Sequence, residues 1–311
     1  HRQAEEDDPP EGTPADTQRM PWSWRVGRIA GIEIYIHSTF LLLIVYLLGM
    51  FYKLGHTALE TSIGIGFVLS LFLCVVLHEY GHALTARRYG IKTRDITLLP
   101  IGGVARLERI PREPYQELLV ALAGPAVNVV IAGLIYAGIS IFGHPPSISD
   151  DNLIGHPLER LMEVNLVLVL FNMLPAFPMD GGRVLRALLA MKIPRMKATR
   201  IASVMGQGMA VLFAMAGFGI FGQGNLMLVF IALFVYLGAV QEYQTIRWEA
   251  AVEGLTARDA MVTNFHTVMA SDPISRAVSL LLQGTQHDFP VLDEKFGVAG
   301  LLLRQDLISV L

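Results

Sequence analysis

The sequence is poor in cysteine and in charged residues. It holds one cysteine, Cys74, among 311 residues, so no disulfide can form within the chain. Charged residues make up 16 % of the sequence, whereas soluble domains carry roughly 25 %. The formal net charge is -3, and the lack of a basic excess argues against a nucleic-acid-binding protein. The hydrophobic share of 53 % instead indicates that much of the chain lies in an apolar environment.

The N-terminal segment lacks an apolar run. Residues 1–19 are acidic and rich in proline, and a signal peptide would need an apolar core there. We therefore expect residues 1–21 to form a disordered tail.

Long apolar runs begin after this tail. Six of them approach the ~20 residues that a helix needs to cross a bilayer. These runs predict an α-helical polytopic membrane protein with a transmembrane domain over residues 22–249. The spans are expected at about 37–54, 62–86, 117–142, 158–178, 200–221 and 225–246.

Lysine and arginine alternate between the loops of these spans. Seven lie between spans two and three and six between spans four and five, whereas residues 143–157 contain none. Basic residues concentrate on the cytoplasmic side of membrane proteins. We therefore expect a multi-pass integral membrane protein with both termini cytoplasmic, in the cell membrane if the organism is prokaryotic. A transporter would fit this topology equally well.

A metal-binding pattern lies at the end of the second run. His78-Glu79-Tyr80-Gly81-His82 is an H-E-x-x-H sequence, and residues four apart share one face of a helix. Two neutral imidazoles suit one zinc ion, and Glu79 can take a proton from the attacking water. Residues 62–77 before it carry no charge, and ionisable groups at membrane depth indicate a functional site. A chance match on a surface helix is the alternative, and Cys74, one turn earlier, is expected to pack.

Catalytic zinc usually has three protein ligands, and Asp180 is the best candidate for the third. Pro175 and Pro178 cannot continue a regular helix, and Gly181-Gly182 permits tight turns. The chain should therefore unwind after span four, on the membrane side of the two histidines. The alternative is that Asp180 caps the helix expected at 184–191.

Together these motifs resemble the site-2 protease family of intramembrane zinc metalloproteases. The family's H-E-x-x-H matches residues 78–82, and its Asp-Gly motif matches Asp180-Gly181 within the N-x-x-P-x-x-P-x-D-G-G pattern of 172–182. The stretch Ala123–Asn128 also looks like a family segment, and the resemblance covers about residues 22–246.

The resemblance implies one zinc ion per chain, held by His78, His82 and Asp180, with Glu79 as the catalytic acid and base. It also implies regulated intramembrane proteolysis, in which a peptide bond in or near the transmembrane segment of a protein substrate is hydrolysed.

Two amide side chains lie inside apolar spans. An unpaired buried amide costs about 1–3 kcal/mol, so Asn128 and Asn172 need partners. They either contact the substrate backbone or a developing oxyanion, which the resemblance favours, or hydrogen-bond between helices. Asn165 is expected to pack.

Residues 98–107 follow the metal-binding helix. Two short apolar stretches flank Gly102-Gly103, which predicts a membrane-associated β-hairpin. An open strand edge there could pair with an extended substrate. A plain amphipathic loop is the alternative.

After Arg247 the composition becomes that of a soluble segment. Strands are expected at 265–269, 289–292 and 298–303, with a helix capped by Asp272 between the first two and another from Arg304. This order resembles a cystathionine-β-synthase (CBS) motif, a small α/β domain, over residues 255–311. The matching features are Pro290-Val291, Gly297, Gly300 and Asp306-Leu307.

CBS motifs work in pairs that bind adenine nucleotides in a cleft. One motif therefore implies either a longer chain or a homodimer formed through this segment. Leu303 stands where nucleotide-binding members commonly have Ser or Thr. Asp306 is accordingly expected either to meet a ribose or to cap a helix.

The leading hypothesis is an intramembrane zinc endopeptidase with a cytoplasmic regulatory module. The alternatives are a CBS-regulated ion transporter or channel, whose His and Asp residues bind the ion, and a non-catalytic scaffold. Glu79 discriminates between them, because neither alternative needs a carboxylate next to a ligand histidine.

Overall fold

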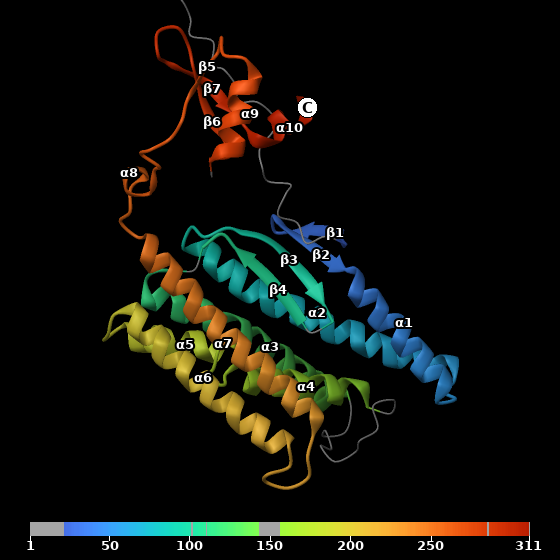
Figure 1. The fold of residues 1–311 in the computed structure, drawn as a ribbon. Helices are drawn as coiled ribbons and strands as arrows, with labels where there is room; N and C mark the ends of the chain where they lie inside the picture. The colour runs from blue at the N-terminus through green and yellow to red at the C-terminus, as the bar shows by residue number, and fades with distance from the viewer. Residues whose placement is uncertain (1–21, 101, 110, 143–155, 285, 311) are drawn as a thin grey trace, which may run out of the picture. The chain divides into compact units, whose positions relative to one another are not determined.

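The computed structural model describes residues 22–100, 102–109, 111–142, 156–284 and 286–310. The chain divides into two compact units between Ala250 and Ala251 (Figure 1). The tail expected at 1–21 lies outside the described residues.

Helices occupy all six places where spans were expected. Four of them are long and apolar enough to cross a membrane: α2 (Ala58–Arg88), α3 (Pro114–Phe142), α6 (Arg195–Gly217) and α7 (Leu226–Val252). The other two, α1 (Ser38–Lys53) and α4 (Pro157–Asn172), have 16 residues each. At 1.5 Å per residue each is about 24 Å long, which is less than the ~30 Å of a bilayer core.

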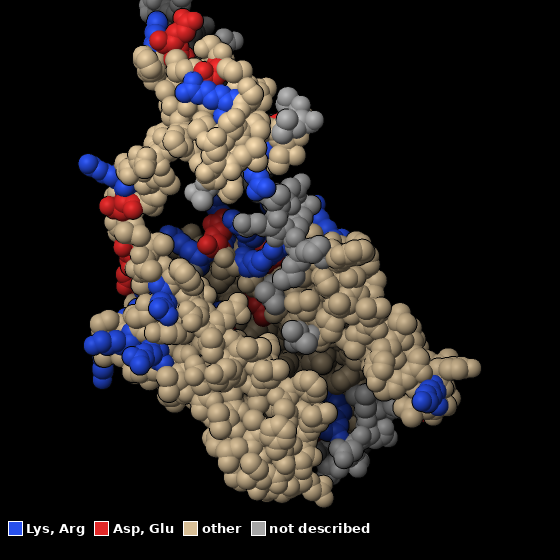
Figure 2. Space-filling view, in the orientation of Figure 1, with Lys and Arg blue, Asp and Glu red and all other residues tan. Residues whose placement is uncertain are grey.

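The surface of these helices matches an apolar surrounding. Figure 2 shows a broad area with few charged side chains over α6 and α7, and lysine and arginine side chains gathered at one end of it. Leu212 of α6 and Phe230 and Leu237 of α7 are among the exposed large apolar side chains. The fold is thus that of a helical membrane protein.

Local signals set the helix ends that matter for the site. A capping box starts α2, since Thr57 Oγ1 accepts from the Glu60 amide and the Glu60 carboxylate accepts from the Thr57 amide. α4 ends at Asn172, three residues before Pro175, and α5 (Asp180–Ala190) begins after Pro178. The predicted break between the fourth span and the next helix is therefore present.

A four-stranded sheet packs against α2. Its order is β1 (Ser23–Ile29), β2 (Ile32–His37), β3 (Thr93–Leu99) and β4 (Gly102–Leu107), with β2 and β3 parallel and the other pairs antiparallel. The predicted hairpin is β3–β4. β4 is the last strand in the order, so its outer edge has no strand partner among the described residues.

The hairpin of β1 and β2 was not anticipated, although Ile32, Ile34 and Ile36 alternate with polar or aromatic residues. It turns at Ala30-Gly31, where both residues have positive φ. Its inner face joins the core that β3 forms with α2, in which Ile34 and Ile96 pack near Phe72.

The second unit follows the predicted order of elements. It contains α8 (Ala257–Ala260), β5 (Val268–Met269), α9 (Ile274–Gln283), β6 (Phe289–Leu292), β7 (Val298–Leu302) and α10 (Arg304–Val310), with the sheet order β5-β6-β7. Its core holds Val268, Ala277, Phe289 and Leu307.

The expected cap of α9 at Asp272 is wrong by one residue. The N-cap is Pro273. The Asp272 carboxylate instead accepts hydrogen bonds from the Met269 amide and from Arg276.

Candidate metal centre

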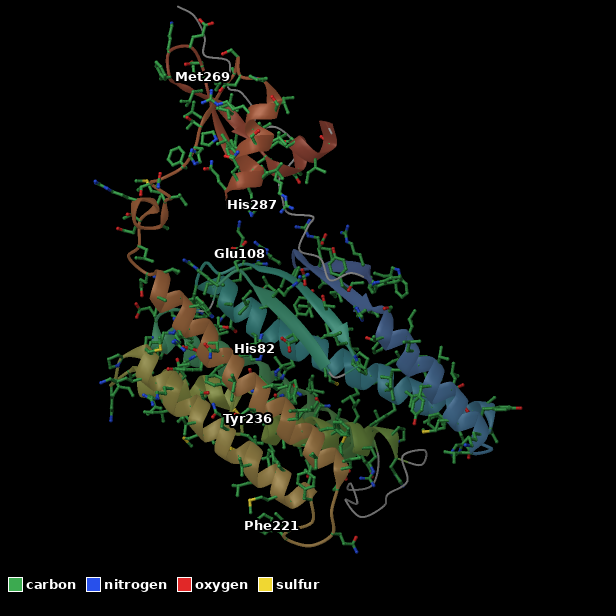
Figure 3. The ribbon with its side chains drawn as sticks, viewed as in Figure 1. His82, Glu108, Phe221, Tyr236, Met269 and His287 are labelled. Carbon is green, nitrogen blue, oxygen red and sulfur yellow. The ribbon has the colours of Figure 1, made fainter. Side chains whose placement is uncertain are left out.

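Three side chains converge in the interior of the membrane domain. Nε2 of His78 and Nε2 of His82 lie 3.0 Å apart, and each lies 3.1 Å from Oδ2 of Asp180. All three residues are buried, and they form a group whose donor atoms could hold a metal ion. Figure 3 labels His82 on α2.

The spacing of these atoms fits zinc. Zn–N and Zn–O bonds of about 2.0–2.1 Å at tetrahedral angles place neighbouring donor atoms ~3.3 Å apart. The observed separations of 3.0–3.1 Å are close to this value. Two imidazoles and one carboxylate leave a fourth position open, as catalytic zinc sites require.

The other nitrogen of each imidazole has its own partner. Nδ1 of His82 lies 2.7 Å from the carbonyl oxygen of Val120, and Nδ1 of His78 lies 3.1 Å from Oδ1 of Asn128. Both partners are oxygen acceptors, so the proton of each neutral ring is placed on Nδ1. The lone pairs on both Nε2 atoms then face Asp180, in the tautomer that a metal needs.

Close packing of α2 and α3 brings these partners into range. A Cβ added to Gly124 would lie 2.6 Å from Nε2 of His78 and closer still to Nε2 of His82. One added to Gly81 would lie 2.6 Å from the carbonyl oxygen of Ala123. Glycine at both positions lets the two helices approach. The structure thereby gives a physical role to the Ala123–Asn128 stretch.

Asp180 is the first residue of α5, and it does not cap that helix. The N-cap is Met179, and its side chain makes no capping hydrogen bond. A Cβ on Gly182 would lie 2.7 Å from the backbone nitrogen of Phe177, so the first turn of α5 packs directly on the preceding loop. The Asp-Gly-Gly sequence therefore positions the carboxylate by backbone contact.

Glu79 lies at the wall of a cavity of about 440 Å³ that also contains the three converging residues. No described residue forms a hydrogen bond or ion pair with its carboxylate. β4 passes close to it, since a Cβ on Gly103 would lie 3.0 Å from Cγ of Glu79. The carboxylate is thus available to a water molecule in the cavity.

The two candidate amides differ in their surroundings. Both line the cavity, but Asn128 is buried and contacts His78, whereas Asn172 is half-buried. Asn165 packs as expected: its Nδ2 donates to the carbonyl of Leu161 at 2.7 Å and lies 3.5 Å from Sγ of Cys74. Cys74 is buried and does not belong to the metal-binding group.

In the second unit, Asp306 is exposed in the first turn of α10. A cavity of about 450 Å³ beside this helix is lined by other residues, among them Asp288 and Arg304.

Several residues near the site were not anticipated. Val120 and Gly124 carry no chemical signal in the sequence, because a backbone carbonyl and a missing side chain act here. Arg183, one turn after Asp180, lines the cavity. In the sequence it was only one of the basic residues counted between spans four and five. The fully buried Arg186 forms ion pairs with Glu117 of α3 and Glu242 of α7. In the sequence it was one of the six basic residues between spans four and five, and no local pattern distinguished it from the others.

Comparison with known proteins gives a consistent result. The model of peptidase family M50 matches residues 66–150 and 141–216, and the CBS domain model matches residues 257–311. A zinc metalloprotease of Methanocaldococcus jannaschii is 38 % identical over 277 residues, covering 88 % of this chain and 76 % of that protein. A candidate zinc metalloprotease of Synechocystis sp. is 34 % identical over 300 residues, covering 92 % of this chain and 77 % of that protein.

The fold comparison agrees. A solved structure, the site-2 protease from Methanocaldococcus jannaschii, superposes with a TM-score of 0.51 at 34 % sequence identity, covering 79 % of this chain and 99 % of that chain.

Proposed function

The chain belongs to peptidase family M50, the site-2 proteases, and from this premise we propose that His78, His82 and Asp180 hold its zinc ion and that Glu79 is its general base and acid. The protein is an intramembrane zinc metalloprotease with a C-terminal CBS domain. The family match does not favour the transporter reading. The observation that carries the residue assignment is the triangle of donor atoms 3.0–3.1 Å apart.

Each residue has a distinct role in this proposal. Zinc, when bound, supplies Lewis-acid activation of water and of the peptide carbonyl. Glu79 takes the proton of the attacking water and returns it to the leaving amine. Val120 and Asn128 hold the two imidazoles in the ligating tautomer.

Substrate is proposed to bind as an extended strand along β4. A helix shields its own peptide bonds, so the substrate must unwind before hydrolysis. No strand of the described part of the chain pairs with the outer edge of β4, and Gly102 and Gly103 of this strand line the catalytic cavity. Asn172, which lines the same cavity, is the proposed contact to the substrate backbone.

The orientation follows from the charge distribution. We propose that both termini and the active-site end of α2 face the cytoplasm. The support is the gathering of basic residues between α2 and α3 and between α4 and α6, while the short connection after α6 carries none.

The C-terminal segment, from residue 255, is proposed to be a regulatory module that pairs with a second copy. CBS motifs work as pairs, and one model match covers this segment. β7 leaves Val298 76 % and Leu301 57 % exposed, and such an apolar surface favours association, most simply with two-fold symmetry. An adenine nucleotide is the proposed effector, with Asp306 as a candidate ribose contact.

Metal analysis tests the site assignment directly. We expect one zinc ion per chain in the purified protein and a large loss of zinc in Asp180→Ala and in the His78→Ala, His82→Ala double variant. Asn172→Ala, which changes another residue of the same cavity, is the control and should keep its zinc. Full zinc occupancy in the double variant would refute the assignment.

A further inference from the structure

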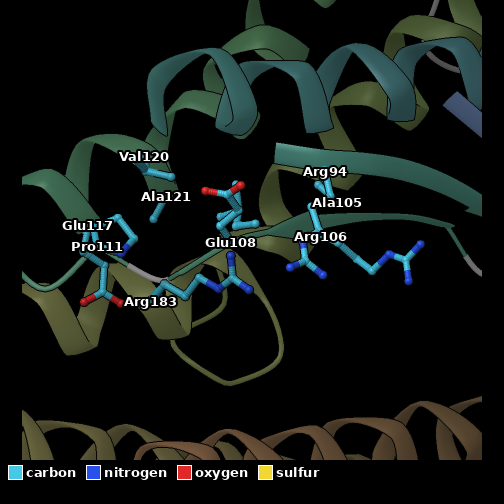
Figure 4. A pocket seen from close by; sticks show the side chains of 10 residues that line it. Arg94, Ala105, Arg106, Glu108, Pro111, Glu117, Val120, Ala121 and Arg183 are labelled. Carbon is cyan, nitrogen blue, oxygen red and sulfur yellow. The ribbon is translucent and has the colours of Figure 1, made fainter. Parts of the chain in front are cut away.

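A second cavity adjoins the catalytic one. It has a volume of about 530 Å³ and is lined by residues of β3, β4, the segment that follows β4, α3 and α5. Ala105, Leu107 and Arg183 line both cavities, so the two are continuous along β4. Figure 4 shows the side chains of Arg94, Arg106, Glu108 and Arg183 around this space.

Three charged side chains that line this cavity differ in whether a neighbouring side chain forms a hydrogen bond or ion pair with them. Glu117 is held by Arg186 at 2.7 Å, and Arg106 is held by Asp95 at 2.7 Å. Arg183 is half-buried and forms no hydrogen bond or ion pair with any described residue. Its charge acts on the nearby carboxylates of Glu79 and Asp180, but no described residue uses its hydrogen-bond donors. This guanidinium lies where the two cavities meet. A half-buried cation in this position favours an anion that enters the cavity.

The register of β4 relates this guanidinium to the cleaved bond. Gly103 lies beside Glu79, and Ala105 and Leu107 follow it by two and four residues. Gly103 lines the catalytic cavity and Ala105 and Leu107 line both, as alternate residues on one side of a strand would, and their neighbours Gly102 and Arg106 also reach these cavities. A substrate strand paired with β4 would therefore carry residues two to four positions from the scissile bond into the second cavity.

We propose that the second cavity is a substrate subsite for an acidic side chain two to four residues from the scissile bond, and that Arg183 is its specificity-determining residue. This inference rests on the proposed function, including strand pairing along β4. The acidic residue would lie on the part of the substrate strand that runs along β4 from the catalytic cavity toward Leu107.

The subsite disfavours basic substrate side chains as well as binding acidic ones. Cytoplasmic flanks of membrane segments carry an excess of lysine and arginine, and Arg183 repels these residues. A glutamate or aspartate gains a charge-assisted, two-pronged hydrogen bond with the planar guanidinium. Hydrogen bonds to charged groups contribute enough to change kcat/KM by about 10- to 100-fold.

A charge-swap experiment on the full-length protein in liposomes tests this subsite. The probe is a synthetic single-span peptide whose apolar segment is interrupted by Gly and Asn, with the cleavage site located by mass spectrometry. Single Glu, Gln or Lys residues are then placed at each of five positions on either side of that site. We expect the wild type to cleave the best Glu peptide about 10- to 100-fold faster, in kcat/KM, than the matching Lys peptide.

Variants at Arg183 provide the decisive comparison. Arg183→Gln should remove the preference, Arg183→Glu should reverse it in favour of Lys, and Arg183→Lys should keep part of it. Lys192→Glu is the control for Arg183→Glu, because it makes the same change from positive to negative charge at an exposed position that lines neither cavity. It should leave the preference for the Glu peptide intact. Zinc content, measured in every variant, separates a specificity effect from damage to the metal site.

The outcomes are distinguishable. Cleavage of the Gln peptides by the wild type tests the proposed function, and failure there overturns both proposals. Cleavage without a charge preference, or a preference that Arg183→Gln leaves unchanged, overturns the subsite alone. The newly formed α-carboxylate is common to all peptides, so a charge-independent effect of Arg183→Gln would assign Arg183 to that group and reject the side-chain subsite.

Discussion

Oδ1 of Asn128 lies 3.1 Å from Nδ1 of His78, on the side of the imidazole opposite the nitrogen that faces Asp180. The amide of Asn128 in α3 therefore contacts a proposed zinc ligand. This relationship separates Asn128 from Asn172, although the two look alike in the sequence.

Asn128→Ala should weaken zinc binding by about 10- to 100-fold, because partners of ligand histidines contribute that much to metal affinity. The measurement is a zinc titration against a competing chelator. Asn172→Ala is the matched control, since Asn172 lines the same cavity but is not among the hydrogen-bond partners of His78, His82 or Asp180 in the described residues. Unchanged affinity in Asn128→Ala would show that the amide does not orient His78.

Glu79→Gln should keep the fold and the zinc but lower turnover by about 10²–10⁴-fold. Glutamine has nearly the same shape as glutamate but cannot accept the proton of the attacking water. Cleavage of a single-span substrate in liposomes and zinc content are measured on the same preparation. Activity near that of the wild type would remove Glu79 from the mechanism and revive the transporter reading.

Gly124→Ala should abolish zinc binding, because the added methyl group would overlap Nε2 of both His78 and His82. The effect is steric, so it should appear without any change of charge or polarity. Gly133→Ala, on the same helix with open space at its Cβ, should bind zinc like the wild type. Elemental analysis compares the two variants, and equal zinc in both would contradict the packing of α3 on the histidine pair.

Arg186→Met should lower the free energy of unfolding by about 3–5 kcal/mol, because it leaves a buried carboxylate without its cation. Arg186 is fully buried, and it joins α5 to Glu117 of α3 and to Glu242 of α7. Denaturant unfolding in detergent gives the measurement. Arg200→Met, at an exposed position of α6, should change stability little. Similar stability of the two variants would argue against a structural role for the ion network.

Deletion from Leu255 onward should leave zinc binding intact and alter self-association or the response to adenine nucleotide. The residues after Ala250 form a separate compact unit, and the metal-binding group lies wholly in the first unit. Zinc content and molar mass of the truncated protein in detergent are the measurements. Loss of zinc from a membrane domain that remains folded would make the C-terminal segment part of the site.

The sequence alone determined the features that depend on neighbouring residues. The four-residue spacing of His78 and His82 places both on one helix face, whatever surrounds that helix. The apolar runs, the break at Pro175 and Pro178 and the β3–β4 hairpin follow in the same way from length, backbone restriction and turn residues. For this reason the helical membrane fold and the histidine pair were predictable. The pairing of the two zinc motifs was expected from the membrane side that they share by charge count and from the family resemblance.

Only the tertiary structure decided which distant residues contact these motifs. The contact of Val120 with His82 involves a backbone carbonyl, and Gly124 acts through the absence of a side chain, so neither leaves a chemical signature in the sequence. In the sequence Arg183 is one basic residue of a loop. In the structure α5 packs against α3, and Arg183 lines two cavities that β4 also lines. Such roles arise from contacts between segments far apart in the chain, and local periodicity carries no information about them.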